Sequence, residues 1–299
     1  MSTPDYDPAQ MLKDLKPTRD FFIGIDSDGC VFDTMEIKHK ECFIPNFINV
    51  FGLQSVSKYA RETWEFVNLY STSRGCNRFP AAILTLDLLR ERMEVKARGA
   101  VIPAMNGLRE WLRHETKLAN PALKRALDAS GDADLALTYE WSLAVNESVA
   151  RMVRGVPPFP LVRESLVDMS GKADMIVLSQ TPVEALRREW EEHDIDSFAR
   201  IIGGQEMGSK TEQLGIAAKG QYPEDRILMV GDAPGDLEAA RKNGALFYAI
   251  NPGHEEASWR RLHEEALGRF FSASYAGSYE NSIIEEFQRY LPESPPWKL

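Results

Sequence analysis

Hydrophobic and polar positions follow two different patterns along the chain. Five short apolar runs, rich in β-branched and aromatic residues, are typical of buried strands. They lie at Phe21–Asp26, Asp174–Leu178, Ala199–Ile202, Arg226–Val230 and Leu246–Ile250. Helical patterns separate the last four runs, at Pro182–His193, Thr211–Lys219 and Gly235–Asn243. Short strands that alternate with helices predict a parallel sheet built from βαβ units.

The stretch between the first and second runs is different, because it has few strand signals and a plain helical periodicity. Helices are expected at Tyr59–Tyr70, Ala81–Arg92, Gly107–Leu118, Pro121–Ala129 and Leu135–Arg154. We therefore expect an α/β core of residues 1–34 and 159–299, interrupted by an all-helical domain of residues 35–158. The patterns His254–Phe271 and Glu280–Leu291 predict additional C-terminal helices on the core.

Composition narrows the class of protein. The chain has 299 residues, 43% of them hydrophobic, and a formal net charge of −10. The hydrophobic share supports a packed core. The negative charge disfavours broad binding to nucleic acid and adhesion to anionic membranes, so neither is expected as a partner.

Targeting and cysteine signals suggest a reduced, cytoplasmic setting. No apolar stretch is long enough to span a bilayer, and residues 1–20 lack the apolar segment of a signal peptide. Cys30, Cys42 and Cys76 have neither paired-thiol nor zinc spacing, and the five histidines show no metal-binding pattern.

Polar residues with related chemistry follow four of the predicted strands. Open parallel sheets place ligands at the carboxyl ends of their strands. Carboxylates from different strands make an oxygen site suited to Mg²⁺, and a lysine and a hydroxyl are donors expected around a phosphoryl group. The residues are Asp26 and Asp28, Ser179, Lys210, and Asp232 with Asp236.

In this order, the four motifs resemble those of the haloacid dehalogenase-like (HAD) superfamily of phosphohydrolases. Asp26-Ser27-Asp28-Gly29 looks like its first motif, Ser179 its second, Lys210 its third, and Asp232 with Asp236 its fourth. The resemblance covers about residues 20–36 and 158–252. It implies a Rossmann-like three-layer sandwich in which the strands before Asp26 and Asp232 are neighbours. The insertion resembles a C1-type helical cap, although it is longer than the common four-helix version.

The same resemblance implies roles for the carboxylates. Asp26 would be the nucleophile and a metal ligand. Asp28 would give a proton to the leaving oxygen and later take one from water, while its backbone carbonyl contacts the metal. Asp232 would be the third protein ligand, and Asp236 would orient Lys210 or a metal-bound water. Cys30 departs from the family pattern, which usually has Thr there; we expect it to be a buried small residue.

Two further positions concern the phosphate group. Ser179 and Lys210 would bind the phosphoryl oxygens. Thr181 competes with Ser179 for this role, and its alternative is to cap the helix that begins at Pro182.

The insertion offers one candidate for substrate binding. The segment Ser73–Pro80 concentrates Arg74 and Arg78 between helices, and arginine can bind a second anionic group. An ordinary charged loop between helices is an equally good interpretation. The tryptophans of this region are expected to pack helices together: Trp64, Trp111 and Trp141.

These inferences predict a Mg²⁺-dependent phosphatase that hydrolyses a small phosphorylated metabolite through an aspartyl phosphate. Two alternatives stay open: a phosphomutase of the same superfamily, or a non-catalytic binding protein that keeps the fold. Dehalogenase and phosphonate-cleaving relatives lack the second acid, so Asp28 argues against both. Neither the phosphate ester nor the oligomeric state follows from the sequence.

Overall fold

The computed structural model describes residues 7–298, so the first six residues of the predicted polar N-terminus lie outside it. The chain divides into two compact units. One, the α/β unit, consists of Met1–Asp33 and Gly155–Tyr290; the other, the helical unit, consists of Thr34–Arg154 and Leu291–Leu299. Residues 291–298 thus group with the helical unit.

The centre of the α/β unit is one five-stranded parallel sheet in the order β3-β2-β1-β4-β5. Most of the strand residues are buried, which is why their sequences are almost continuously apolar. The parallel sheet and the adjacency of β1 and β4 confirm the predicted fold class. The strands are β1 (Phe21–Ile25), β2 (Ala173–Leu178), β3 (Ile201–Gly203), β4 (Ile227–Gly231) and β5 (Leu246–Ala249).

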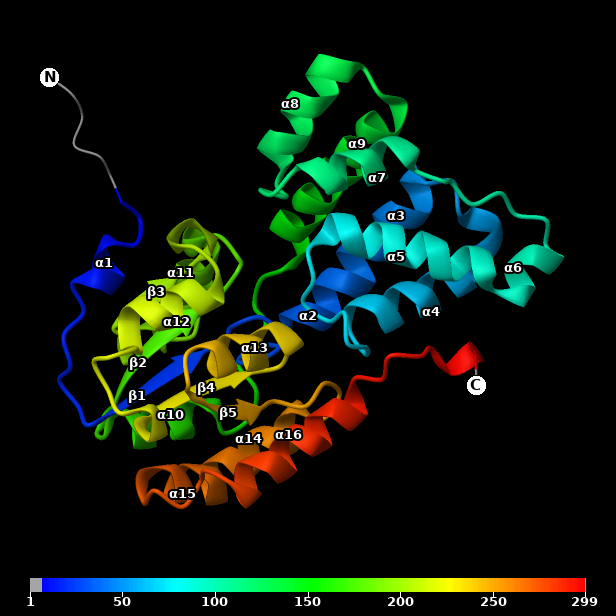
Figure 1. The fold of residues 1–299 in the computed structure, drawn as a ribbon. Coiled ribbons are helices and arrows are strands. Elements are labelled where there is room, and N and C mark those ends of the chain that lie inside the picture. The colour runs from blue at the N-terminus through cyan, green and yellow to red at the C-terminus, as the bar shows by residue number, and fades with distance from the viewer. Residues whose placement is uncertain (1–6, 299) are drawn as a thin grey trace, which may run out of the picture. The chain divides into compact units, whose positions relative to one another are not determined.

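Helices cover both faces of this sheet, which makes three layers (Figure 1). Helices α12 and α13 pack on each other and on the sheet from one side, and α10, α14 and α16 lie on the other. The predicted helix 254–271 is interrupted by a π-helical turn, Leu262–Ala266. The helices are α1 (Gln10–Lys13), α10 (Val162–Ser170), α11 (Val183–Glu192), α12 (Lys210–Ala218), α13 (Pro234–Lys242), α14 (Glu255–Arg261), α15 (Leu267–Phe271) and α16 (Ser278–Tyr290).

The second unit consists of helices among its described residues, as expected. The five helices predicted there correspond to α4, α5, α7, α8 and α9. A π-helical turn, Lys38–Phe43, joins α2 to α3; this region and α6 were not predicted. The helices are α2 (Thr34–Ile37), α3 (Ile44–Val50), α4 (Ser57–Asn68), α5 (Arg78–Glu91), α6 (Met93–Ala97), α7 (Asn106–His114), α8 (Asn120–Ser130) and α9 (Ala133–Met152).

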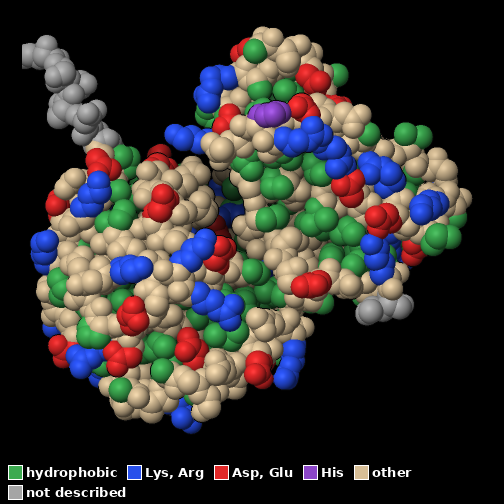
Figure 2. Space-filling view, in the orientation of Figure 1, with side chains coloured by type: hydrophobic (Ala, Val, Ile, Leu, Met, Phe, Trp, Pro, Cys, Tyr) green, Lys and Arg blue, Asp and Glu red, His purple; other side chains and the backbone are tan. Residues whose placement is uncertain are grey.

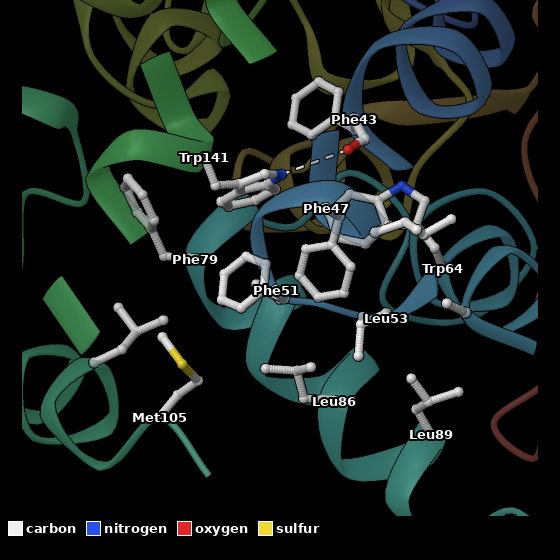
Figure 3. Packing of buried hydrophobic residues seen from close by; sticks show 14 of the residues in the cluster. Phe43, Phe47, Phe51, Leu53, Trp64, Phe79, Leu86, Leu89, Met105 and Trp141 are labelled. Atoms are coloured by element: carbon white, nitrogen blue, oxygen red, sulfur yellow. Dashed lines mark hydrogen bonds between the residues drawn. The ribbon is translucent and has the colours of Figure 1, made fainter. Parts of the chain in front are cut away.

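Aromatic side chains form the core of the helical unit (Figure 3). Trp64 of α4 and Trp141 of α9 meet edge to face, with ring centroids 5.8 Å apart, and both contact Phe47. The indole Nε1 of Trp141 donates a hydrogen bond to the Phe43 carbonyl oxygen. Trp111 is buried as well. The three tryptophans therefore pack helices together, as the sequence predicted.

The surface is mixed in character. On the face shown in Figure 2, acidic and basic side chains are interspersed, with apolar side chains scattered between them. Met93 and Val101 of the helical unit are the most exposed large apolar residues of the described chain. Among the described residues, no helix combines the length and the apolar character needed to cross a membrane.

The C-terminal segment Leu291–Lys298 is fastened to the helical unit by its penultimate described residue, Trp297. The Trp297 ring meets the Phe66 ring edge to face at 5.5 Å, and the Arg92 guanidinium carbon lies 4.3 Å from the indole centroid. Lys298 adds an ion pair with Glu91. Both α4 and the end of α5 thus hold this segment.

We predict that Trp297→Ala will release the C-terminal segment. Loss of the aromatic pair and of the cation–π contact should remove about 1–3 kcal/mol. Hydrogen exchange should accelerate at residues 291–298 and spare the strands β1 and β4. Trp297→Phe, which keeps an aromatic ring, is the matched control. Unchanged exchange in Trp297→Ala would show that the segment is held by other contacts.

A buried carboxylate, Asp174, organises the amino-end of the sheet. It is the second residue of β2, and its side chain is 1% exposed. It accepts hydrogen bonds from the Thr18 amide (2.7 Å), the Tyr222 hydroxyl (2.7 Å) and Arg200 Nη1 (2.8 Å). Burial alone would raise the pKa of Asp174, but the hydrogen bonds from Thr18, Tyr222 and Arg19 outweigh burial and lower it. The carboxylate therefore joins the N-terminal segment to the sheet.

We predict that Asp174→Asn will lower the free energy of unfolding by about 2–4 kcal/mol at neutral pH, because it places an amide NH₂ among buried donors. The folded pKa of Asp174 is below the unfolded value of 3.8. Its stabilising effect is thus complete above that pH and lost as the pH falls through the folded pKa. Urea unfolding at several pH values should show a wild-type-to-variant difference that is constant above about pH 5 and shrinks below 3.8. A difference independent of pH would contradict this assignment.

Candidate active site

The carboxyl edge of the sheet brings the predicted acidic residues together. Ile25 of β1 is level with Val230 of β4, so the residues that follow the two strands are neighbours. The Asp26 amide donates to the Val230 carbonyl oxygen at 3.0 Å. Carboxylate oxygens of Asp26, Asp232 and Asp236 lie within 4.8 Å of one another, and all three residues are buried. Residues some two hundred positions apart in sequence therefore share one small volume.

Lys210 reaches this carboxylate cluster from the loop after β3. Its Nζ lies 2.7 Å from Asp26 Oδ2 and 2.6 Å from Asp236 Oδ1. Lys210 is the first residue of α12, which Ser209 and Glu212 begin with a capping box. Gly208 precedes the cap with φ of +103°, a conformation that favours glycine. The capping box and Gly208 thus determine where α12 begins, and Lys210 lies at that first position.

Burial and like charges dominate the electrostatics of the cluster. Burial raises the pKa of Asp26 well above its usual range, and Asp236 and Asp232 add to this effect, while Lys210 opposes it. Burial likewise raises the pKa of Asp236. For Lys210, burial would lower the pKa, but the carboxylates of Asp236, Asp26 and Asp232 outweigh burial and raise it. One ammonium among three carboxylates leaves a formal charge of −2 when all are ionised (−3 + 1).

The donor set fits a hard divalent cation, which prefers carboxylate oxygens. Asp236 has protein partners at both of its carboxylate oxygens, as Asp26 does with the Ser27 amide and Lys210. Its Oδ1 accepts from Lys210, and its Oδ2 accepts from the backbone amides of Asp232 (3.1 Å) and Ala233 (3.0 Å). These contacts of Asp236 hold Lys210 and the loop after β4 in place.

Asp28 and the turn after β2 meet at the same edge. Gly29, with φ of +78°, turns the chain after Asp28. Asp28 Oδ2 accepts a hydrogen bond of 2.6 Å from the Thr181 hydroxyl. Ser179 is buried, and its Oγ accepts from the Thr181 amide at 3.1 Å. The side chain of Thr181 does not cap α11, whose N-cap is Pro182 without a side-chain bond. Thr181 thus contacts the first motif instead of starting a helix.

Gln213 is a residue of this region that sequence reasoning missed. It is completely buried, and its Nε2 donates to the carbonyl oxygens of Gly208 (2.9 Å), Gly204 (3.1 Å) and Ser179 (3.4 Å). The side chain therefore ties the turn after β2 to the loop that carries Lys210. Its only sequence signal is a polar residue three positions after Lys210 on a helix, which ordinarily indicates a solvated face.

Arg74 and Arg78, the candidates for substrate binding, have guanidinium groups that bond within the helical unit. Arg74 is buried and donates from Nη1 to the Leu69 carbonyl oxygen at 2.9 Å. Arg78 donates from Nη1 to Asn146 Oδ1 at 2.8 Å, and burial lowers its pKa to about 10.

The predicted loop Ser73–Pro80 also requires a correction. Helix α5 begins inside it, at Arg78, because Asn77 accepts the capping hydrogen bond from Phe79 N.

Cys30 is completely buried behind the first motif, as expected for a small residue at that position. Its Sγ lies 3.8 Å from the Val230 carbonyl oxygen, and its own carbonyl accepts from Trp259 Nε1 at 2.7 Å. Burial raises the pKa of the thiol, and Asp232 and Asp26 raise it further. The thiol is therefore held in its protonated form.

Comparison with known proteins gives similarity at the level of solved structures. No family model and no curated protein matches the sequence. A HAD-like family hydrolase from Streptococcus pneumoniae is 14% identical, with a TM-score of 0.42, over 82% of this chain and 91% of that one. A candidate phosphoglycolate phosphatase from Lactobacillus delbrueckii is 14% identical, with a TM-score of 0.45, over 83% and 92%. A 2-haloacid dehalogenase from Pseudomonas syringae is 16% identical, with a TM-score of 0.37, over 80% and 87%.

The descriptions of these structures name a HAD-like hydrolase, a candidate phosphoglycolate phosphatase and a dehalogenase. They name different reactions, and identities and TM-scores this low decide neither the reaction nor the family of this chain. The chemistry has to come from the side chains at the carboxyl edge.

We predict that Lys210→Met will destabilise the protein by about 3–5 kcal/mol at neutral pH, because it leaves buried carboxylates without their counter-charge. The carboxylates of Asp26 and Asp236 have raised folded pKa values, so this penalty should shrink as the pH falls toward 4.

Thermal or urea unfolding with Lys219→Met as control measures the effect, since Lys219 is exposed at the far end of the same helix. Equal stability of the two variants would show that Lys210 does not compensate the carboxylates.

Proposed function

We propose that this protein is a HAD-like phosphohydrolase that uses Mg²⁺ to hydrolyse a small phosphorylated metabolite through an aspartyl phosphate. The juxtaposition of Asp26 with Lys210 and Asp232 at the carboxyl edge of the sheet carries this proposal. A buried carboxylate paired with a lysine and flanked by cation-binding oxygens is a suitable nucleophile for an anionic phosphate ester.

In the first half-reaction, an Asp26 carboxylate oxygen attacks phosphorus while the bond to the leaving oxygen breaks. Asp28 supplies the proton that this oxygen takes up. In the second half-reaction, water attacks the same phosphorus, the bond to Asp26 breaks, and Asp28 takes the proton of the water. Lys210 and Ser179 would stabilise the charge that develops on the phosphoryl oxygens. The Ser179 Oγ accepts from the Thr181 amide, so its own proton is suited to this purpose.

Asp26, Asp232 and the backbone carbonyl of Asp28 would hold the Mg²⁺ ion. When bound, the ion would offset the charge of the carboxylates and of the phosphate, which keeps Asp26 ionised. Without a cation, burial and neighbouring charges raise the pKa of Asp26, which opposes its use as a nucleophile. This requirement supports a divalent cofactor over a metal-free reaction.

A phosphomutase is the second candidate, because the same residues could pass the phosphoryl group from Asp26 to a sugar hydroxyl. A non-catalytic binding role is less well supported, since Asp26, Asp28 and Lys210 are all present and Lys210 contacts Asp26. We also propose a cytoplasmic setting, which suits the three free cysteines.

Phosphate release from a panel of small phosphate esters, with and without Mg²⁺, tests the proposal. We expect Mg²⁺-dependent release by the wild type and a loss of at least about a thousandfold in Asp26→Asn. Asp225→Asn, an exposed acidic residue before β4, is the matched control and should retain activity. Release by Asp26→Asn at the wild-type rate would exclude the aspartyl phosphate. Transfer to an added sugar in preference to water would favour the mutase.

A further inference from the structure

We propose that Thr181 is a positioning residue for Asp28, and that its hydroxyl fixes the orientation of the Asp28 carboxylate. This inference rests on the proposed function. It starts from the hydrogen bond of 2.6 Å that Thr181 Oγ1 donates to Asp28 Oδ2. A hydroxyl that donates to a carboxylate makes a short, charge-assisted bond, and this bond restricts rotation of the aspartate side chain.

The bond can hold this orientation throughout the reaction. Oδ2 can continue to accept from Thr181 in both states, because the carbonyl oxygen of a protonated acid is still an acceptor. A general acid that later becomes a general base benefits from an orientation that survives the change of protonation.

The backbone around Thr181 is fixed on both sides, which gives the hydroxyl a defined place. The Thr181 amide donates to Ser179 Oγ, and its carbonyl accepts from the Gln205 amide at 3.1 Å. Gly204 packs directly against this turn: a β-carbon there would lie 2.7 Å from the Thr181 carbonyl oxygen and 2.6 Å from Val183 N. Threonine is also stiff at χ1, because it is branched at Cβ.

The capping role that would otherwise explain a threonine before a proline is absent. The helix α11 starts at Val183 with Pro182 as its N-cap, and that cap makes no side-chain hydrogen bond. The Thr181 hydroxyl therefore donates its hydrogen bond to Asp28 and does not cap the helix.

The inference can be tested with two aryl phosphates. Their leaving groups differ in how much they need a proton donor. The 4-nitrophenolate ion leaves without protonation, whereas phenolate is more basic and benefits from a proton donor. We expect Thr181→Val to lower kcat/KM for phenyl phosphate by about 10–100-fold and for 4-nitrophenyl phosphate by less than about threefold. The parameter kcat/KM reports steps up to departure of the leaving group, so later hydrolysis of the aspartyl phosphate does not affect the comparison.

Two variants separate positioning from folding. Thr181→Ser keeps the hydroxyl and should restore most of the phenyl phosphate activity. Thr18→Val removes a hydroxyl that donates to the buried carboxylate Asp174 at the other end of β2, so it should lower stability and leave the ratio of the two substrates unchanged.

Equal losses on both substrates in Thr181→Val, or no rescue by Thr181→Ser, would overturn the role of Thr181 and leave the proposed function intact. A wild type that cleaves only the nitrophenyl ester would also overturn this role, because leaving-group protonation would then be absent. A wild type that cleaves neither ester would overturn the proposed function, and the role of Thr181 with it.

Discussion

The two ion pairs of Lys210 hold the carboxyl edge of the sheet together. The lysine enters from the loop after β3, and its partners, Asp26 and Asp236, follow β1 and β4. In the order β3-β2-β1-β4-β5, these strands do not all touch, so one ammonium group links connections that the backbone ladder leaves separate. Buried carboxylates whose oxygens lie within 4.8 Å of one another repel, and the positive charge of the lysine offsets this repulsion. The glycine turn and the capping box at the start of α12 are the local features that deliver it.

Two buried aspartates in the same sheet show how surroundings decide the use of one residue type. Asp174 lies at the amino-end, where neutral donors and Arg200 surround it and its pKa is lowered. Asp26 lies at the carboxyl end, where burial and two other carboxylates raise its pKa despite the contact with Lys210. The first group is satisfied within the protein, which suits a structural role. The negative charge of the second group is only partly offset by the protein. A bound cation would offset the rest, which suits a catalytic role.

The sequence predicted the sheet and its carboxyl edge because both depend on strong local signals. Each buried strand is a nearly continuous apolar run, and the first polar residues after it must lie at the edge. The region around α2 and α3 was missed because a π-helical turn, Lys38–Phe43, breaks the 3.6-residue periodicity there. Helix α10 was also missed; it directly follows the proline-rich segment 157–160. Arg78 shows another limit: charge is visible in a sequence, but burial by tertiary packing is not.

The contacts of Thr181 and Gln213 could not be predicted for a related reason. Each depends on how two loops meet. The turn after β2 meets the loop after β3 through a backbone approach that only glycine allows at Gly204. Once the loops are in contact, the two hydroxyls after β2 acquire different partners. Ser179 accepts from the Thr181 amide, so its proton can be donated outward, while the proton of Thr181 is directed to Asp28. Two similar side chains in one turn are thus differentiated by backbone geometry, and their separate uses in a phosphoryl-transfer site follow from that difference.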